Sequence, residues 1–283
     1  MLGLGRMGSA IARRLLSQEQ QVYGWNRTPE KGEPLVALGL GWAETPAQLV
    51  AAVDYCLILL SDAQAIGDTL SSEAVLNQLP GRTCLQMGTI APDQSRALAH
   101  QIEGVGGRYL EAPVLGSRPE AEAGKLIIMA GGSGETFEHC LPLLRLLGEA
   151  PRLVGSVGQG AVVKLAMNQL IAGLTASFSL SLGLVRAEGV SVELFMDLLR
   201  NSALYAPTFD KKLLKYLNST YGEANFSLKH LRKDVHLFRQ VAESLGLDGT
   251  LLTAMEQACD RGMDQGLADR DYSVLYEILQ HKA

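Results

Sequence analysis

The most constraining feature of this sequence is a long, nearly uncharged segment near its middle. From Ala161 to Ala187 the only charged residues are Lys164 and Arg186, and the turn Gly158-Gln159-Gly160 precedes the segment. Its pattern predicts a single helix of roughly 40 Å, at 1.5 Å per residue. Short Val/Leu/Ile runs alternate with helical patterns before this helix, whereas only helical patterns follow it. The chain therefore changes character at the helix.

Lys164 is a cation on this largely apolar helix, and Asn168 follows it four residues later. Residues at this spacing share one helix face, one turn apart. A buried ammonium is costly unless it has partners or a function. A lysine at a helix start can also pack its stem and keep its head in water. The spacing alone leaves both interpretations open.

Length and composition limit the classes of protein to which the chain can belong. Its 283 residues exceed a typical single core and favour two domains. With 47% hydrophobic and 19% charged residues, the chain is not disordered. The net charge of −5 is spread without acidic or basic blocks, so nothing indicates binding to nucleic acid or to an anionic membrane. We expect the partner to be a small molecule or another copy of the chain.

The cysteines and the apolar helix bear on the cellular setting. The four cysteines are widely separated, in neither a zinc pattern nor a disulfide framework, so we expect no metal site. No basic-then-apolar leader precedes the first motif, which favours a reducing, cytoplasmic setting. The central helix has a membrane-spanning length, but polar residues interrupt it, which favours a buried core or subunit-interface helix. These polar residues are Asn168, Gln169, Thr175, Ser177, Ser179 and Ser181.

The first residues carry glycines at the spacing of the dinucleotide-binding fingerprint, followed at once by a helical pattern. The first glycine permits the tight turn, the second lets the backbone approach a pyrophosphate, and the third lets helix and strand pack closely. The pyrophosphate then lies at the helix N-terminus. Only Met1 and Leu2 precede the motif, so we expect a very short or truncated first strand. The predicted cofactor contacts of this turn are Gly3, Leu4, Gly5, Arg6, Met7 and Gly8.

A second cofactor signal follows the next strand candidate, Gln21 to Trp25. This strand ends in Asn26, Arg27 and Thr28, about twenty residues after the glycines. An NAD-selective site usually has an acidic residue there, whereas an arginine beside a hydroxyl residue suits a 2′-phosphate. Arg27 therefore favours NADPH (NADP+), with NADH still possible. The alternative is an ordinary solvated arginine at a turn.

Two further runs, Tyr55–Leu60 and Thr83–Met87, are typical of buried parallel strands. Ligands bind at the carboxyl ends of such strands, so Leu60, Ser61 and Thr89 are candidate cofactor or substrate contacts. Polar residues there can equally cap the next helix. Other expected strands are 107–111, 125–130 and 152–155, with an exposed turn at 113–117, and expected helices are 46–53, 63–79, 95–103, 135–147, 192–201, 207–216, 228–245 and 250–265.

The motifs occur in a fixed order: the glycine turn, Asn26-Arg27-Thr28, Gly116-Ser117, Gly158-Gln159-Gly160 before Lys164, and Phe226 ahead of Lys233-Asp234. With its motifs in this order, the chain resembles the β-hydroxyacid dehydrogenase family. Within that family it is most similar to the glyoxylate/succinic semialdehyde reductases, which are relatives of 3-hydroxyisobutyrate dehydrogenase. The resemblance covers essentially the whole chain. It implies an α/β Rossmann-like N-terminal domain (1–157) and an all-α C-terminal domain (158–283), joined by the long central helix, with the active site in the cleft between them.

The resemblance also implies a role for each motif. A lysine matching Lys164 gives a proton to the carbonyl oxygen as NADPH delivers its hydride, and a lysine with a burial-lowered pKa can serve as that acid. The other implied roles are Asn168 orienting substrate or lysine, Ser117 and the Gly116 backbone near the substrate carboxylate, Thr89 near the nicotinamide ribose, Lys233 and Asp234 closing on the cofactor, and Phe226 as a pocket wall. A helix beginning near Ser227 could instead place the basic residues around Lys233 in solvent.

Two positions depart from the family pattern. Leu115 stands where members commonly have a serine, and Met167 stands where a second asparagine often occurs. The resemblance implies NADPH-dependent reduction of a small aldehyde acid, such as glyoxylate or succinic semialdehyde, to the hydroxy acid. The alternatives are an NAD(P)-dependent dehydrogenase of the 3-hydroxyisobutyrate type and a non-catalytic dinucleotide-binding scaffold; imine reductases share the fold but usually lack the lysine. The apolar central helix further predicts a homodimer or homotetramer.

Overall fold

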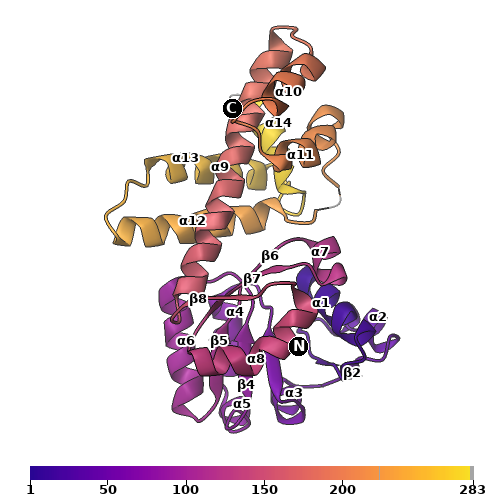
Figure 1. Ribbon diagram of the computed structural model, residues 1–283, viewed down its shortest axis with the longest axis vertical. Helices are drawn as coiled ribbons and strands as arrows, with labels where there is room; N and C mark the ends of the chain where they lie inside the picture. The colour runs from indigo at the N-terminus through magenta and orange to yellow at the C-terminus, as the bar shows by residue number, and fades with distance from the viewer. Residues whose placement is uncertain (223, 281–283) are drawn as a thin grey trace. The chain divides into compact units, whose positions relative to one another are not determined.

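The structure is a computed structural model that describes residues 1–222 and 224–280. The chain forms two compact units, Met1–Lys164 and Leu165–Ala283. Helix α9 (Gln159–Ala187) begins in the first unit and continues into the second (Figure 1). The units thus divide inside the long helix, whereas the sequence-based boundary after residue 157 lies just before that helix begins.

The first unit is built on a mostly parallel sheet. The path β3-β4-β5-β7-β6 forms its main part, and β8 pairs with β7. Strands β3, β4 and β5 are parallel, whereas β7 runs antiparallel to both β5 and β6. The strands are β1 (Tyr23–Gly24), β2 (Gly41–Trp42), β3 (Tyr55–Ile58), β4 (Thr83–Gln86), β5 (Arg108–Glu111), β6 (Val114–Leu115), β7 (Ile127–Gly131) and β8 (Arg152–Gly155).

The expected short first strand is reduced to Leu2, which bridges in parallel to Trp25 on one side and to Ile58 on the other. Leu2 N–H donates to the Leu57 carbonyl at 2.8 Å, and the Leu2 carbonyl accepts from Leu59 N–H at 2.8 Å. One fully buried residue thus joins the small β1-β2 sheet to the main sheet. The Gly3 turn follows directly from it.

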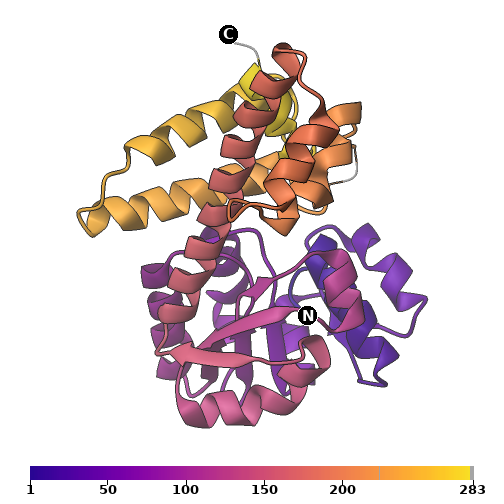
Figure 2. The same ribbon diagram turned by 45° about the horizontal axis from the view of Figure 1, so that its top comes forward.

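Helices cover both faces of the sheet, and each face has its own hydrophobic cluster (Figure 2). Because side chains alternate along a strand, Leu57 and Leu85 join one cluster while Cys56 and Cys84 join the other. This arrangement is the predicted Rossmann-like fold. The helices are α1 (Arg6–Ser17), α2 (Glu33–Val36), α3 (Pro46–Ala52), α4 (Ala63–Leu70), α5 (Glu73–Leu76), α6 (Pro92–Gly104), α7 (Arg118–Ala123) and α8 (Gly134–Leu147).

Two local predictions are wrong. The segment 113–117, expected as an exposed turn, has Pro113 and Val114 buried and forms β6, because its backbone pairs with β7. The helix expected over 63–79 is divided into α4 and α5 at Ser71, where the chain leaves the helix.

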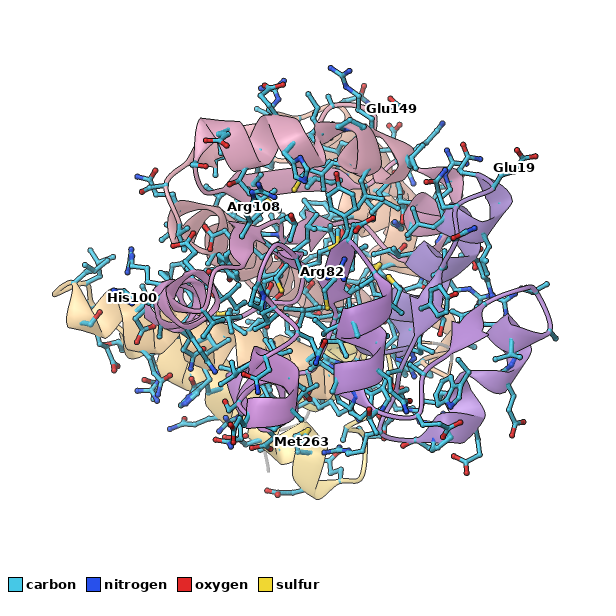
Figure 3. The ribbon with its side chains drawn as sticks, turned by 90° about the horizontal axis from the view of Figure 1, so that it is seen from below. Glu19, Arg82, His100, Arg108, Glu149 and Met263 are labelled. Carbon is cyan, nitrogen blue, oxygen red and sulfur yellow. The ribbon has the colours of Figure 1, made fainter. Side chains whose placement is uncertain are left out.

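At the amino ends of the strands, Arg82 pairs with Asp54 at 3.0 Å beside the start of β4 (Figure 3).

The second unit is helical, as predicted. No strand occurs among the described residues after Gly155. Each of the four helices expected after the central one is present within a few residues of its predicted bounds. The remaining helices are α10 (Val192–Arg200), α11 (Pro207–Asn218), α12 (Leu228–Ser244), α13 (Thr250–Asp264) and α14 (Leu275–Gln280).

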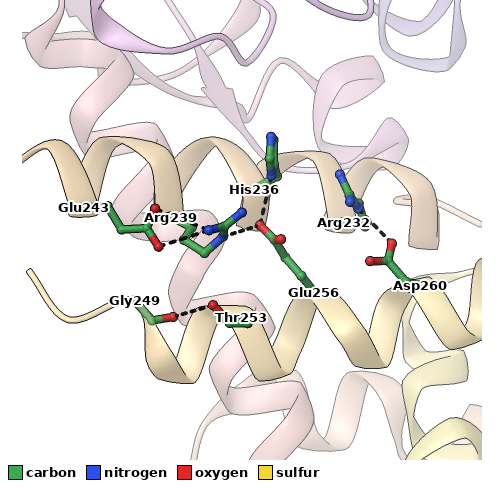
Figure 4. A network of polar contacts seen from close by, with 8 residues as sticks. All are labelled: Arg232, His236, Arg239, Glu243, Gly249, Thr253, Glu256 and Asp260. Carbon is green, nitrogen blue, oxygen red and sulfur yellow. Dashed lines mark hydrogen bonds and ion pairs between the residues drawn. The ribbon is translucent and has the colours of Figure 1, made fainter.

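Buried and half-buried ion pairs connect the helices of the second unit. Lys212 of α11 donates to both oxygens of Asp271, at 2.8 and 2.9 Å. Burial raises the pKa of Asp271, but hydrogen bonds from Lys212 and Ser273 outweigh it, so the net pKa is lowered. On α12 and α13, Glu256 accepts from Arg239 at 3.0 Å and contacts His236 at 3.1 Å (Figure 4). These contacts hold the two antiparallel helices in register.

Within the described residues, α9 is also the one helix whose length and composition would suit a membrane span. A single such helix is weak evidence, because a core helix of a globular domain meets the same criteria. All four cysteines are free and buried.

Candidate active site

The glycine turn lies between Leu2 and α1, and its three glycines are required for different reasons. Gly3 has φ +96°, and a Cβ there would lie 2.5 Å from the Leu59 carbonyl oxygen. A Cβ on Gly8 would lie 2.1 Å from the Gly3 carbonyl oxygen. In contrast, a Cβ on Gly5 would meet no atom within 4 Å. Packing therefore demands Gly3 and Gly8, whereas Gly5 faces open space.

The open side of Gly5 is the N-terminal end of α1. Gly5 is the N-cap of this helix, and no side chain caps it. The N–H groups of the first turn and the helix dipole favour an anion there. Arg6 and Met7 form the same first turn. The turn thus fits the pyrophosphate of a dinucleotide on geometry as well as on spacing.

The segment after β1 is tied to the glycine turn. Asn26 accepts from Leu4 N–H through Oδ1 at 2.9 Å and donates to the Thr28 carbonyl through Nδ2 at 2.8 Å. Arg27 and Thr28 are exposed beside it. The structure therefore ties Asn26 to the glycine turn and leaves the adjacent Arg27 and Thr28 exposed to solvent.

The carboxyl ends of β3 and β4 lie at the same edge. A Cβ on Gly3 would lie 3.1 Å from the Leu60 side chain, and one on Gly88 would lie 3.0 Å from the Leu60 carbonyl oxygen. Thr89 follows Gly88 directly and is half-buried. Ser61 Oγ donates to Asp62 at 2.8 Å, and it is Asp62 that caps α4.

Ser117 is engaged by a carboxylate from its own helix. Its N–H donates to Oε2 of Glu120 at 2.7 Å, and its hydroxyl donates to the same oxygen. The bond from the Ser117 N–H to the Glu120 side chain is one half of the capping box of α7. Gly116, with φ +141°, precedes it, and its Cβ would lie 2.8 Å from Leu126. Sequence reasoning missed Glu120, although a serine followed three residues later by glutamate is the signal of a capping box.

Lys164 and Asn168 are both buried on α9, at 8% and 4% exposure. Asn168 Nδ2 donates to Oδ2 of Asp234 at 2.6 Å. Lys233 Nζ lies 3.1 Å from the other oxygen of Asp234, which is itself 3% exposed. The structure thus brings Asn168, Lys233 and Asp234 together, with Lys164 one helical turn before Asn168.

Phe226 precedes α12 and is half-buried. Its ring centroid lies 5.8 Å from that of Tyr272 and 6.3 Å from that of His230. These contacts hold the Phe226 ring in place.

Sequence reasoning assigned no role to Glu111, the last residue of β5. This carboxylate is 1% exposed and accepts hydrogen bonds from the N–H groups of Gly158 and Gly160 and from the Ser95 hydroxyl. The sequence did contain a signal, because Glu111 is an acidic residue at the end of an apolar run. A buried acid needs several hydrogen-bond donors, so such a residue is expected to contact other segments of the chain.

Two family models together match residues 1–279 of this chain. Residues 1–159 match the family described as the NAD binding domain of 6-phosphogluconate dehydrogenase. Residues 158–279 match the family described as NAD-binding of NADP-dependent 3-hydroxyisobutyrate dehydrogenase.

Two curated relatives align with nearly the whole of this chain. Glyoxylate/succinic semialdehyde reductase 1 of Arabidopsis thaliana is 34% identical over 281 residues, covering 99% of this chain and 97% of that protein. The chloroplastic reductase 2 of the same plant is 31% identical, covering 99% of this chain and 78% of that protein. Among solved structures, Psf3 in complex with NADP+ and 2-OPP matches with a TM-score of 0.88 at 25% identity, covering 98% of both chains.

The open space at Gly5 generates a test of cofactor placement. Gly5→Ala should weaken NADPH binding at least about tenfold, because the new methyl would hold the pyrophosphate away from the α1 N–H groups. Its φ of −70° suits alanine, so thermal stability should stay unchanged. The measurement is fluorescence titration with NADPH beside a thermal melt.

Gly67→Ala in α4 is the matched control, because a Cβ there also meets nothing within 4 Å. It should leave cofactor affinity unchanged and stabilise the helix slightly. Wild-type affinity in Gly5→Ala would show that the pyrophosphate does not approach this turn.

Proposed function

The chain belongs to the β-hydroxyacid dehydrogenase family, and from that membership we propose that it uses NADPH to reduce a small aldehyde acid to the hydroxy acid. It is an NAD(P)-dependent oxidoreductase with an NAD(P)-binding N-terminal unit. The names of the two Arabidopsis relatives support glyoxylate and succinic semialdehyde as the substrates to be tried first. The single observation that carries the proposal is the burial of Lys164 and Asn168 on one face of α9.

In the proposed mechanism Lys164 is the proton donor. Bound NADPH supplies a hydride to the carbonyl carbon of the substrate. As that carbon accepts the electron pair, charge develops on the carbonyl oxygen, and the Lys164 ammonium donates a proton to it. The products are the hydroxyl group and NADP+, and Lys164 recovers its proton from water. A buried ammonium is effective here because a low dielectric strengthens its interaction with the developing charge.

Asn168 and its neighbours would orient the reacting groups. Asn168 Nδ2 donates to Asp234, and the Oδ1 of the same amide is an acceptor by its chemistry. Lys233 balances the Asp234 charge at 3.1 Å. We assign Asn168 to orienting the lysine or the substrate, and Lys233 and Asp234 to the cofactor side of the site, with Phe226 as a pocket wall.

The assignment of the substrate carboxylate rests on Ser117 and Gly116. In the structure the N–H and hydroxyl of Ser117 both donate to the carboxylate of Glu120. A substrate carboxylate would use the same kind of donors, so in this proposal it displaces Glu120 from Ser117. Leu115, half-buried at the end of β6, supplies no hydroxyl to this group. Thr89, Leu60 and Ser61 are assigned to the nicotinamide end of the cofactor.

Two alternatives to the proposed reduction make different use of Lys164. Oxidation of a 3-hydroxyisobutyrate-type acid would use the same residues with the proton moving from the hydroxyl to Lys164. A non-catalytic scaffold would bind the dinucleotide and have no use for a buried lysine. Initial rates of NADPH oxidation with each aldehyde, and of NADP+ reduction with 3-hydroxyisobutyrate, distinguish the three.

Replacing the proposed proton donor is the direct test. Lys164→Ala should lower kcat by a factor of about 10² to 10⁴, the usual contribution of a positioned acid, with NADPH affinity retained. Lys211→Ala, on the exposed side of α11, is the control and should retain the wild-type rate. Wild-type turnover by Lys164→Ala would remove the lysine from the mechanism.

Arg27 provides the test of cofactor preference. Arg27→Ala should raise KM for NADPH about tenfold to a hundredfold, the value of a charge-assisted contact to the 2′-phosphate, and leave KM for NADH unchanged. Lys31→Ala, exposed nearby, is the control. An equal change for both cofactors would argue against a 2′-phosphate contact.

We also propose a homo-oligomer assembled through α9. Leu170, Leu180 and Leu184 lie on one stripe of this helix and are 60%, 55% and 67% exposed. Such a stripe favours burial against a second copy. Leu184→Asp should shift sedimentation equilibrium at micromolar concentration towards the monomer, whereas Leu214→Asp, exposed on α11, should not. A monomeric wild-type protein would contradict the assembly.

A further inference from the structure

A buried carboxylate lies where α9 begins. Oε1 of Glu111 accepts from the N–H groups of both Gly158 and Gly160, each at 2.7 Å. Oε2 accepts from the Ser95 hydroxyl at 2.5 Å, and Ser95 Oγ lies 2.8 Å from the hydroxyl of Tyr109. The carboxylate therefore has three donors and connects the end of β5 to the first turn of the helix that carries Lys164.

Glycines on both sides leave room for this carboxylate. Glu111 is opposite Gly131 in the β5-β7 pair, and a Cβ on Gly131 would lie 2.1 Å from Oε1. A Cβ on Gly160 would lie 2.6 Å from the Met129 carbonyl oxygen and 3.0 Å from Oε1. Gly158 has φ +98°, which favours glycine. Gly160 thus leaves room for the carboxylate, whereas Gly158 is required by its backbone conformation and by the Arg96 side chain, 2.7 Å from the position of a Cβ.

The contact between the Glu111 carboxylate and the start of α9 combines two stabilising effects. A carboxylate at a helix N-terminus gains from the helix dipole and from charge-assisted hydrogen bonds to otherwise unpaired N–H groups. Both donors belong to the helix start, so one oxygen determines the rotation and axial position of the first turn. Lys164 follows Gly160 by four residues, one turn further along α9.

We propose that Glu111 is a positioning residue for the reaction, which acts by holding the first turn of α9 so that Lys164 is directed at the substrate carbonyl. This inference rests on the proposed role of Lys164. The Glu111 carboxylate accepts from the helix start and from Ser95, so in this proposal it acts through the lysine. Because proton transfer depends steeply on geometry, a displacement of about 1 Å is enough to lower the rate about a hundredfold.

Two substitutions separate the charge of Glu111 from its hydrogen bonds. In Glu111→Gln the amide oxygen can still accept from both glycine N–H groups, while the amide nitrogen donates to Ser95. Glu111→Ala leaves the two N–H groups without an acceptor. We expect kcat per NADPH-binding site to fall about tenfold in Glu111→Gln and about a hundredfold in Glu111→Ala, with NADPH affinity within about threefold of wild type. Glu149→Gln, an exposed glutamate (Figure 3), is the matched control and should leave kcat unchanged.

A double-mutant cycle with Lys164→Ala decides whether Glu111 acts through the lysine. If it does, Glu111→Gln lowers kcat in the wild-type background and causes no further loss in the Lys164→Ala background. An equal loss in both backgrounds, or wild-type kcat in folded Glu111→Gln, overturns the inference. Wild-type turnover of Lys164→Ala alone would instead refute the proposed function. Should Glu111→Ala fail to fold, the isosteric glutamine variant carries the test, with kcat normalised to titrated NADPH sites.

Discussion

One oxygen atom connects the sheet to the longest helix. Oε1 of Glu111 accepts from two N–H groups at the start of α9, at 2.7 Å each, inside a core where the carboxylate is 1% exposed. A charge so buried is tolerated only when its acceptors are filled, and Ser95 supplies the third donor. This contact ties the first turn of α9 to the end of β5, and Lys164 lies one helical turn further along.

The position of the proposed cofactor site depends on a different constraint. The carboxyl ends of neighbouring strands lie at the same edge of the sheet. Leu2 bridges to Trp25 and Ile58, so the turns after three neighbouring strands come to one edge. Asn26 then ties the glycine turn to the end of β1 through Leu4. The sheet supplies the frame, and the groups that we propose to contact the cofactor are backbone N–H groups and short polar side chains at its edge.

The sequence predicted the fold well because its signals are local. Hydrophobic periodicity located the strands and helices, and glycine spacing located the turn before α1. The contacts that it could not supply are those between distant segments. Glu111 and Gly158 are far apart in sequence, and no local pattern indicates that an acid will meet a helix start. The same reason explains the error at 113–117, where a turn-like composition was overridden by pairing with β7. Asp234 was assigned to the site by resemblance, whereas its hydrogen bond to Asn168 emerged only from the structure.

The glycines show how structure separates packing from function. Gly3, Gly8, Gly131 and Gly160 each have a protein atom closer than 3 Å to the position of a Cβ, so packing alone accounts for them. Gly5 has no atom within 4 Å and lies at an uncapped helix N-terminus. A glycine in open space at an uncapped helix N-terminus leaves the backbone accessible to an anion, which a side chain there would hold away. The sequence motif alone does not show which of its glycines packing requires. The structure shows that packing does not require Gly5, and this supports a cofactor at that position.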